Sequence, residues 1–207
     1  MWEDIVIAVK GKRIAILGAK ATGKTTLADF LSKGEIPQEY FQTIGVDRKD
    51  KRPFELKDLN LKIYLKSFND VEAGLGARTI WQEEVKKADV VLYLFDTNKL
   101  LRYDEDAVRK GYAKRIKSDL EQVCSWLHEK TGPQSLYILG TFCDQDPNYD
   151  PSRLSTYRDE LVERDELKEM KRILKGKIEV TWIFGSTKDL KSTEAIVKLW
   201  LKILLRK

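Results

Sequence analysis

Histidine and cysteine are scarce in this chain of 207 residues, which contains one His and two Cys. Cys124, Cys143 and His128 do not form the closely spaced set of about four ligands that a structural zinc site needs, so no zinc site is expected. Two cysteines far apart favour reduced thiols in a cytosol. We therefore expect a cytoplasmic protein.

Long apolar runs and lipid-attachment motifs are also missing. The apolar stretch 196–205 is interrupted by Lys198 and Lys202 and is too short to span a bilayer. No glycine follows Met1 for myristoylation, and no prenylation cysteine precedes the end at Lys207. We expect no signal peptide, no transmembrane segment and no lipid anchor.

Charge of one sign is not concentrated in any part of the sequence. The 38 Lys and Arg residues and the 33 Asp and Glu residues give a net charge of +5, and the basic residues are spread along the whole chain. A nucleic-acid-binding protein needs a concentrated basic face, so no nucleic-acid partner is expected. The length and the hydrophobic share of 42% fit one globular domain over residues 1–207.

A complete phosphate-binding motif, Gly-x-x-x-x-Gly-Lys-Thr, runs from Gly18 to Thr25. The apolar run 14–17 before it predicts a buried strand, and 25–33 after it has the apolar spacing of a helix. Such a turn directs backbone N–H groups toward a phosphate at the positive end of the helix dipole. Lys24 would lie near the β- and γ-phosphates, and the Thr25 hydroxyl would reach Mg²⁺. The predicted phosphate-binding residues of the loop are Ala21, Thr22, Gly23, Lys24, Thr25 and Thr26.

Apolar strand patterns alternate with helical patterns along the rest of the chain. In chain order they predict strands and helices at 13–17, 25–33, 77–87, 89–95, 105–130, 135–140, 178–184 and from 190 onward. This alternation predicts an α/β protein with the P-loop NTPase fold, a mostly parallel, doubly wound sheet with helices on both faces. Ligands of such sheets bind at the carboxyl ends of the strands.

Two hairpins and one charged segment complete the predicted fold. Strands 4–9 and 13–17 flank a Lys-Gly-Lys turn and form an N-terminal β-hairpin extension, and a second hairpin is predicted from 53–57 and 61–67. Residues 34–52 are expected to be irregular, and 68–78 to form a loop. Residues 152–176 form an extended charged helical segment within the domain, with acids and bases interspersed as on a solvated face.

Thr43-Ile44-Gly45 follows the first predicted helix, and here the similarity to a known family becomes specific. Together with the phosphate loop, this segment resembles the small GTPases of the Ras superfamily, nearest to the Arf-like group. The resemblance implies GTP and GDP as ligands with Mg²⁺, and it implies that Thr43 closes on Mg²⁺ and the γ-phosphate. It also implies that effector or regulatory proteins bind through switch regions 34–52 and 68–80.

The second switch departs from the family pattern Asp-x-x-Gly, which a catalytic glutamine often follows. Asp70 keeps the carboxylate that would hold Mg²⁺ through water. In one register Ala73 replaces the glycine and Gly74 the glutamine; in the other, Gly74 is the glycine and Leu75 replaces the glutamine. Neither register has the amide that orients the attacking water, so slow hydrolysis is expected. Glu72 is a candidate substitute for that amide.

The base-recognition motif of the family, Asn-Lys-x-Asp, is altered to Thr-Phe-Cys-Asp at 141–144. The Asp144 carboxylate can accept hydrogen bonds from guanine N1–H and N2–H₂, a donor pair that adenine lacks. Thr141 would partly replace the asparagine. Phe142 would replace the lysine by stacking on the base.

A turn after the last predicted strand, Ser186-Thr187-Lys188, is similar to the Ser-Ala-Lys turn of the family. The resemblance implies that the Thr187 N–H meets guanine O6 and that Lys188 packs over the base plane. The predicted guanine-binding residues are therefore Thr141, Asp144, Ser186, Thr187 and Lys188. The predicted Mg²⁺ ligands are Thr25, Thr43 and Asp70.

Taken together, these motifs predict a guanine-nucleotide-binding molecular switch that hydrolyses GTP slowly with Mg²⁺, using Lys24 and backbone amides as its catalytic groups. Two alternatives stay open. A pseudo-GTPase would serve as a binding or scaffold module without significant hydrolysis, and the altered motifs favour it. A P-loop nucleotide or small-molecule kinase would need an arginine-rich lid, for which 152–176 is the candidate segment.

Overall fold

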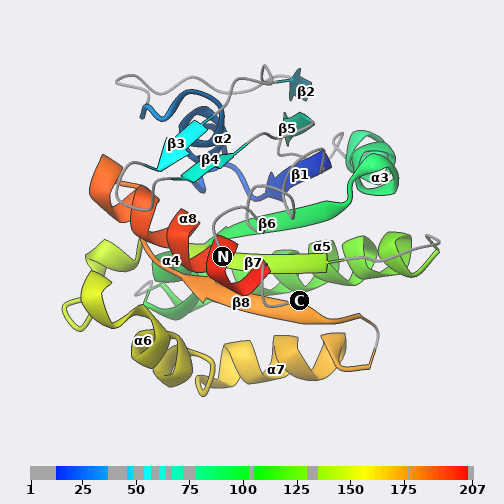
Figure 1. The fold of residues 1–207 in the computed structure, drawn as a ribbon. Coiled ribbons are helices and arrows are strands. Elements are labelled where there is room, and N and C mark those ends of the chain that lie inside the picture. The colour runs from blue at the N-terminus through cyan, green and yellow to red at the C-terminus, as the bar shows by residue number, and fades with distance from the viewer. Residues whose placement is uncertain are drawn as a thin grey trace.

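A six-stranded sheet lies at the centre of the computed structural model (Figure 1). Its strands, in chain order, are β1 (Arg13–Gly18), β2 (Val46–Arg48), β5 (Ser67–Val71), β6 (Val90–Asp96), β7 (Ser135–Thr141) and β8 (Val180–Phe184). The helices are α2 (Lys24–Lys33), α3 (Arg78–Lys87), α4 (Thr97–Leu101), α5 (Asp106–His128), α6 (Leu154–Leu161), α7 (Asp165–Leu174) and α8 (Leu190–Leu204). The structure describes residues 13–36, 46–48, 54–56, 61–63, 67–71, 78–102, 105–129, 135–176 and 178–204, and for the strands between 46 and 71 it describes the backbone alone.

The order in which strands are added to the sheet reverses at β1. The strand order is β2-β5-β1-β6-β7-β8, so the chain passes from β1 through α2 to the β2 and β5 side and then returns to β6 on the other side of β1. Strands β5, β1, β6, β7 and β8 pair in parallel, whereas β2 pairs antiparallel with β5. Ligands of open parallel sheets bind outside the carboxyl ends of the strands at such a switch point. Gly18, the last residue of β1, lies there.

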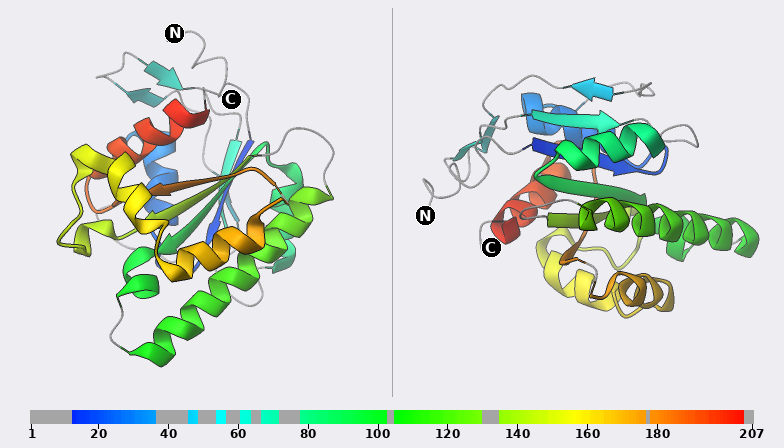
Figure 2. Two further views of the ribbon diagram at one scale, coloured as in Figure 1. Left: turned by 90° about the horizontal axis from the view of Figure 1, so that it is seen from below. Right: turned by 90° about the vertical axis from the view of Figure 1, so that its right-hand side faces the viewer.

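Helices cover both faces of the sheet (Figure 2). Because side chains alternate along a strand, β1 contributes residues to both faces. Ile14 and Ile16 pack in the core cluster that includes residues of α2 and α8, and Ala15 and Leu17 pack in the cluster that includes residues of α3 and α5. Strand β6 is buried along its whole length, as expected for a strand covered on both faces. The predicted α/β fold with a mostly parallel, doubly wound sheet is confirmed at this level.

Helices α6 and α7 lie beyond the edge strand β8 and carry the charged segment 152–176 (Figure 1). One side of each helix is nevertheless apolar and buried, through Leu154, Tyr157, Leu161, Leu167, Met170 and Leu174. All of them except Leu154 pack in the same core cluster as Trp182 of β8 and Ile116 of α5. The segment is helical as predicted, but it is two helices anchored in the core, because the buried residues are hidden among charged ones in the sequence.

Within the described residues, strands occur where the apolar patterns predicted them, and two further strands occur in polar segments where none was predicted. The second predicted hairpin exists as β3 (Phe54–Leu56) paired antiparallel with β4 (Leu61–Ile63). However, β5 runs through the first part of the predicted loop 68–78, and β2 lies within the segment predicted to be irregular, 34–52. The sequences of β2 and β5 lack apolar alternation, and it is pairing within the sheet that makes them strands.

Two further predictions concern the N-terminal hairpin and the absence of a transmembrane segment. The first strand of the predicted N-terminal hairpin, 4–9, lies outside the described residues. Within the described part of the chain, every helix is either too short or too polar to cross a membrane.

Candidate functional site

The phosphate loop connects the end of β1 to the start of α2 and has an unusual backbone. Gly18 and Gly23 have φ angles of +139° and +82°, and Ala21 between them has a φ of +58°. A Cβ atom on Gly18 would overlap the carbonyl oxygen of Leu94, and one on Gly23 would overlap Thr187 Oγ1. Both glycines are therefore required by conformation and by close packing. Successive residues that mix left-handed and right-handed conformations are typical of loops whose amides form an anion-binding nest.

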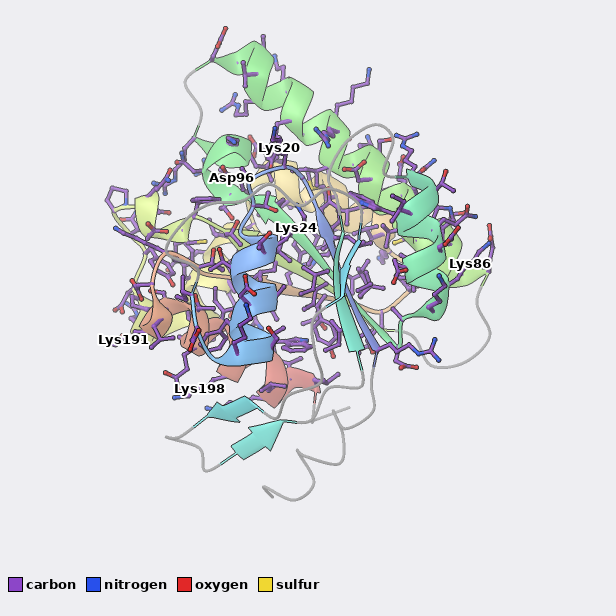
Figure 3. All side chains as sticks on the ribbon, turned by 90° about the horizontal axis from the view of Figure 1, so that it is seen from above. Lys20, Lys24, Lys86, Asp96, Lys191 and Lys198 are labelled. Atoms are coloured by element: carbon purple, nitrogen blue, oxygen red, sulfur yellow. The ribbon has the colours of Figure 1, made fainter. Side chains whose placement is uncertain are left out.

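Lys24 opens helix α2, and its side chain folds back over the loop. Only 8% of the residue is exposed, and its Nζ donates a hydrogen bond to the carbonyl oxygen of Ala19 at 2.9 Å. The Thr22 hydroxyl donates to the same oxygen at 2.9 Å. Figure 3 shows Lys24 on the first turn of α2, at the end of the sheet where Lys20 and Asp96 also lie. The cationic group is thus held within the phosphate loop.

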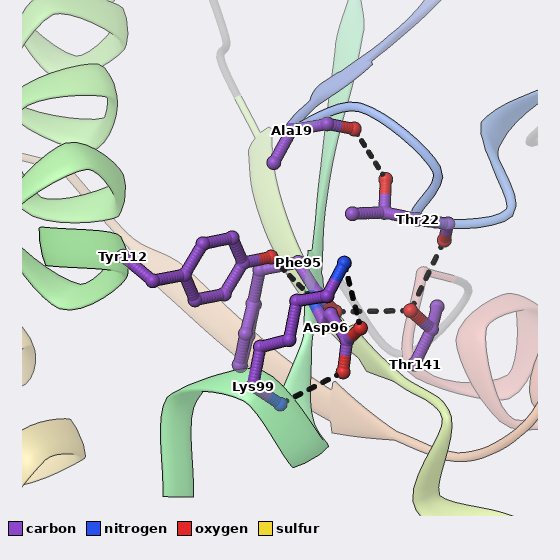
Figure 4. Close-up of polar contacts among 7 residues, drawn as sticks. All are labelled: Ala19, Thr22, Phe95, Asp96, Lys99, Tyr112 and Thr141. Carbon is purple, nitrogen blue, oxygen red and sulfur yellow. Dashed lines mark hydrogen bonds and ion pairs between the residues drawn. The ribbon is translucent and has the colours of Figure 1, made fainter. Parts of the chain in front are cut away.

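Thr141, the last residue of β7, connects this loop to the sheet (Figure 4). The residue is fully buried, and its hydroxyl lies 3.0 Å from the carbonyl oxygens of both Thr22 and Phe95. Because a hydroxyl has one proton, these two acceptors share it. Thr141 therefore bridges the phosphate loop and β6. Its hydroxyl proton is engaged by the backbone, so the geometry gives this predicted guanine ligand a positioning role.

The other predicted guanine-binding residues converge beside the loop. The Ser186 hydroxyl donates to Asp144 Oδ1 at 2.5 Å and accepts a hydrogen bond from the Lys188 N–H at 3.1 Å. Lys188 Nζ lies 3.9 Å from the second carboxylate oxygen of Asp144. Ser186 is buried, whereas 22% of the Asp144 side chain is exposed. One oxygen of the Asp144 carboxylate is thus held by Ser186, and part of the side chain is exposed to solvent.

Contacts join the loops that follow β7 and β8 to each other and to the phosphate loop. The Cys143 N–H donates to the Gly185 carbonyl oxygen at 3.1 Å. Thr187 packs directly against Gly23, since a side chain on that glycine would overlap its hydroxyl. The loops that follow β1, β7 and β8 therefore meet at one place, at the carboxyl ends of three parallel strands.

Backbone strain is concentrated in the same loops. Among the residues that the structure describes, Ala21 and Phe142 are the two non-glycine residues with positive φ, at +58° each. One lies in the phosphate loop, and the other lies in the altered base motif, where its half-buried ring precedes Cys143. Strained residues of this kind persist where surrounding contacts hold them, and they occur often at functional sites.

A buried polar network supports the loop that follows β7. Asp146 accepts hydrogen bonds from the Tyr157 hydroxyl and from the Asn148 N–H, both at 2.8 Å, and it forms an ion pair with Arg102. Burial alone would raise the pKa of Asp146, but the bonds from Asn148, Arg102 and Tyr157 outweigh it and lower that pKa. Burial raises the pKa of the neighbouring Cys143 thiol to about 12. This cysteine is therefore a protonated packing residue and not a nucleophile.

Sequence reasoning missed two carboxylates that shape the site. Asp96 ends β6 next to the phosphate loop, where its Oδ1 accepts from the Lys99 N–H at 3.0 Å and caps helix α4 (Figure 4). A charged residue directly after an apolar strand was the available signal. Asp146 is one of several acidic residues in a loop that is also rich in proline, so nothing in the local sequence distinguishes it. Its partner Tyr157 is in the charged segment, so no local pattern connects the two.

Several predicted site residues have limited structural descriptions. Thr43 and Glu72 lie outside the described residues, and for Asp70 the backbone alone is described. That backbone lies in β5 directly opposite Ile16 of β1, two positions before Gly18, which places Asp70 on the strand next to the loop. Of the predicted Mg²⁺ ligands, Thr25 lies in the first turn of α2. Thr26 follows it there.

Acidic, cysteine and histidine side chains form no group of three suited to a metal ion within the described ranges. The predicted Mg²⁺ set, with two threonine hydroxyls and one carboxylate, would not produce such a group. A comparison with protein-family models and a comparison with curated proteins both gave no match for this chain.

Proposed function

We propose that this protein is a guanine-nucleotide-binding switch of the small-GTPase type, with Mg²⁺ and slow GTP hydrolysis. One observation carries the proposal. The phosphate loop, the Asp144 segment and the Ser186 turn are far apart in sequence, yet they meet at the switch point of the sheet. A loop with the motif for phosphate binding and a partly exposed carboxylate that could accept from a base are thereby adjacent, and this supports binding of a nucleoside triphosphate.

Each group would act on a different part of the nucleotide. The backbone amides of the loop and Lys24 would bind the phosphate oxygens and stabilise charge that develops during hydrolysis. Asp144, held by Ser186, would accept from guanine N1–H and N2–H₂, and Lys188 would cover the base with its stem. Thr141 would fix the loop relative to the base site. When bound, Mg²⁺ would neutralise part of the phosphate charge through Thr25, Thr43 and Asp70.

The kinase alternative receives less support from the fold. It needs a mobile arginine-rich lid over the phosphates, but α6 and α7 are anchored in the core by five buried side chains. Arg158 of this segment donates two hydrogen bonds to the neighbouring Asp159, at 2.7 and 2.9 Å. Such a pairing is typical of a surface helix and not of a catalytic lid.

Nucleotide competition tests the proposal. GTP should displace a fluorescent guanine nucleotide from the purified protein at much lower concentration than ATP. Asp144→Asn should weaken GTP binding by about 2 kcal/mol or more, because a charged acceptor for two donors is lost. Asp150→Asn is a matched control, since Asp150 is an exposed carboxylate that also accepts from a serine. Equal displacement by ATP would contradict guanine selectivity and favour the kinase.

Single-turnover hydrolysis separates the GTPase from the pseudo-GTPase. With no glutamine after Asp70, the rate should be at or below the roughly 10⁻⁴ s⁻¹ of an unassisted Ras-type enzyme. Bound GTP that stays intact would favour a pseudo-GTPase. A further decrease in Glu72→Ala would assign Glu72 to the water, whereas turnover near about 1 s⁻¹ would reveal an unidentified catalytic group.

A further inference from the structure

A groove with a volume of about 550 Å³ lies between helix α7 and the edge strand β8. One wall carries four cations, Lys168, Lys171, Arg172 and Lys175. Lys171 and Arg172 lie three and four residues after Lys168 on one side of α7, and Lys175 follows as the C-cap of that helix. No acidic side chain is among the described residues that line the groove. Lys168 forms an exposed ion pair with Glu163 outside it, at 3.3 Å.

The floor of the groove is apolar and comes from the end of α7 and the start of β8. It consists of Leu174, Ile178, Val180 and Trp182. Leu174 and Trp182 are buried, and Ile178 and Val180 are half-buried, so aliphatic surface is open at the bottom of the groove. A ligand that fits this groove must combine acidic groups with apolar side chains.

The geometry distinguishes a peptide from a nucleic acid. Trp182 is the aromatic residue of the floor, but its ring is stacked on Phe184 at an interplanar angle of 10° and meets Phe95 edge-on at 6.4 Å. Only 7% of Trp182 is exposed, so it offers no free face on which a base could stack. Lys168 and Lys175 are seven positions apart, or about 10 Å along α7 and its C-cap, which matches about three residues of extended peptide.

The groove between α5 and α7 on the other side of the same helix has a different character. Acidic residues line it together with lysines, and Lys117 pairs with Glu169 across it at 2.7 Å. That groove does not select a ligand of one sign, whereas the groove beside β8 does. We propose that the groove between α7 and β8 binds a short acidic, partly apolar peptide segment of a partner protein.

This docking surface is separate from the proposed nucleotide site. Its residues surround the amino end of β8, which begins at Val180, whereas Ser186 follows the carboxyl end of that strand. Binding to the groove should therefore not require nucleotide. The Lys24→Ala variant should bind the peptide as the wild type does, so failure of the nucleotide proposal and failure of the groove proposal give different results.

Fluorescence anisotropy with a labelled peptide Gly-Glu-Leu-Glu-Val-Glu-Gly tests the proposal, with a second peptide carrying Gln in place of each Glu as control. The double variant Lys171→Glu/Arg172→Glu should weaken binding at least about tenfold, because it reverses charge on the wall. Lys86→Glu/Lys202→Glu, two exposed lysines on α3 and α8, should change it less than about twofold. Nucleotide affinity should be unchanged in both double variants.

A third variant separates binding in the groove from general attraction to a basic protein. Ile178→Lys removes apolar floor and adds charge, so groove binding should weaken by about fivefold while simple charge attraction would strengthen. Equal losses in the two double variants, unchanged or tighter binding in Ile178→Lys, or no peptide binding would overturn the proposal. Tighter binding of a labelled decathymidylate would assign the groove to nucleic acid instead. A dimer that Lys171→Glu/Arg172→Glu dissociates would assign it to a second copy of the chain.

Discussion

The two sides of the candidate site, which we propose bind the phosphates and the base of a nucleotide, are constructed in different ways. On the phosphate side, one continuous stretch from Gly18 to Lys24 supplies the loop, its positive φ angles and the cation. On the base side, Asp144 and Ser186 are 42 residues apart and are joined by a side-chain hydrogen bond of 2.5 Å. The phosphate side depends on local backbone geometry, whereas the base side depends on side chains that only the folded sheet brings together.

This difference explains how each side can vary. A phosphate loop needs glycines and one lysine at fixed spacing in one short stretch, so the whole motif can be seen in the sequence. A side-chain network can change its members as long as buried polar groups keep their partners. Thr141 illustrates this, because its hydroxyl bonds to two backbone carbonyls and so holds the loop and β6 together.

Removal of the cation should have the largest effect and should leave the base side intact. Lys24→Ala should weaken GTP binding by about 3 kcal/mol, or at least about a hundredfold, because a buried, hydrogen-bonded charge facing phosphate is lost. Calorimetry with GTP measures the change. The control Lys33→Ala removes an exposed lysine from the other end of α2 and should have little effect. Undiminished affinity in a folded Lys24→Ala protein would contradict phosphate binding at this loop.

A methyl group between the two sides should damage both. Gly23→Ala would strain a φ of +82° and push into Thr187 Oγ1, so we expect about 2 kcal/mol less stability and at least about tenfold weaker GTP binding. Gly176→Ala is a matched control, since Gly176 has a φ of +77° with open space around the added atom. The difference between the two variants in urea unfolding measures the contact with Thr187. Equal destabilisation, with nucleotide affinity retained, would show that the two sides do not touch.

The sequence predicts the two sides unequally for the same physical reason. The strand, turn and helix around Gly18 are adjacent in the chain, so periodicity and spacing are enough to predict them. The bridge from Thr141 to Thr22 spans 119 residues and depends on how β7 and β6 are ordered beside β1. No local pattern contains that order. The resemblance of the turn at 186–188 to a family motif indicated the region but not its bonds.

The charged segment 152–176 shows that local sequence patterns are also insufficient to predict parts of the fold. Alternating acids and bases at 152–176 predict a solvated face, and many of its residues are exposed. The structure also buries Tyr157 in this segment, where its hydroxyl bonds to Asp146 under the base-side loop. Composition averages over both sides of a helix, so it cannot identify one buried tyrosine. Similarly, β5 is polar in sequence and becomes a strand through its pairing with β1.

Lowering the pH should remove the stability that Asp146 contributes on the base side. Because the pKa of Asp146 is lowered in the folded state, its contribution to stability is present above the unfolded value of about 3.9 and is lost as pH falls through the folded value. Residues 18–24 contain no carboxylate. Asp146→Asn should reduce the free energy of unfolding by about 2 kcal/mol near neutral pH, and the difference from wild type should narrow in acid.

Urea unfolding from neutral pH to below about 3 measures this narrowing. Asp106→Asn is the control, because the pKa of Asp106 is also lowered, by hydrogen bonds from Lys110 and Arg109, but this carboxylate is on the surface. Its substitution should change stability less than that of Asp146. A constant difference between Asp146→Asn and wild type across the pH range would show that the carboxylate contributes only through packing.

Loss of the hydroxyl that orients Asp144 should have the smallest effect and gives the sharpest test of the comparison. Ser186→Ala removes the donor to Asp144 Oδ1 and the acceptor for the Lys188 N–H, so GTP affinity should fall by about 1 kcal/mol, or about fivefold. Because only the base side changes, the loss should be equal for GTP and GDP in competition binding. Ser152→Ala is the control, since Ser152 makes a similar bond of 2.7 Å to an exposed aspartate, Asp150. A loss confined to GTP would mean that Ser186 acts on the γ-phosphate, and the division into a phosphate side and a base side would then be wrong.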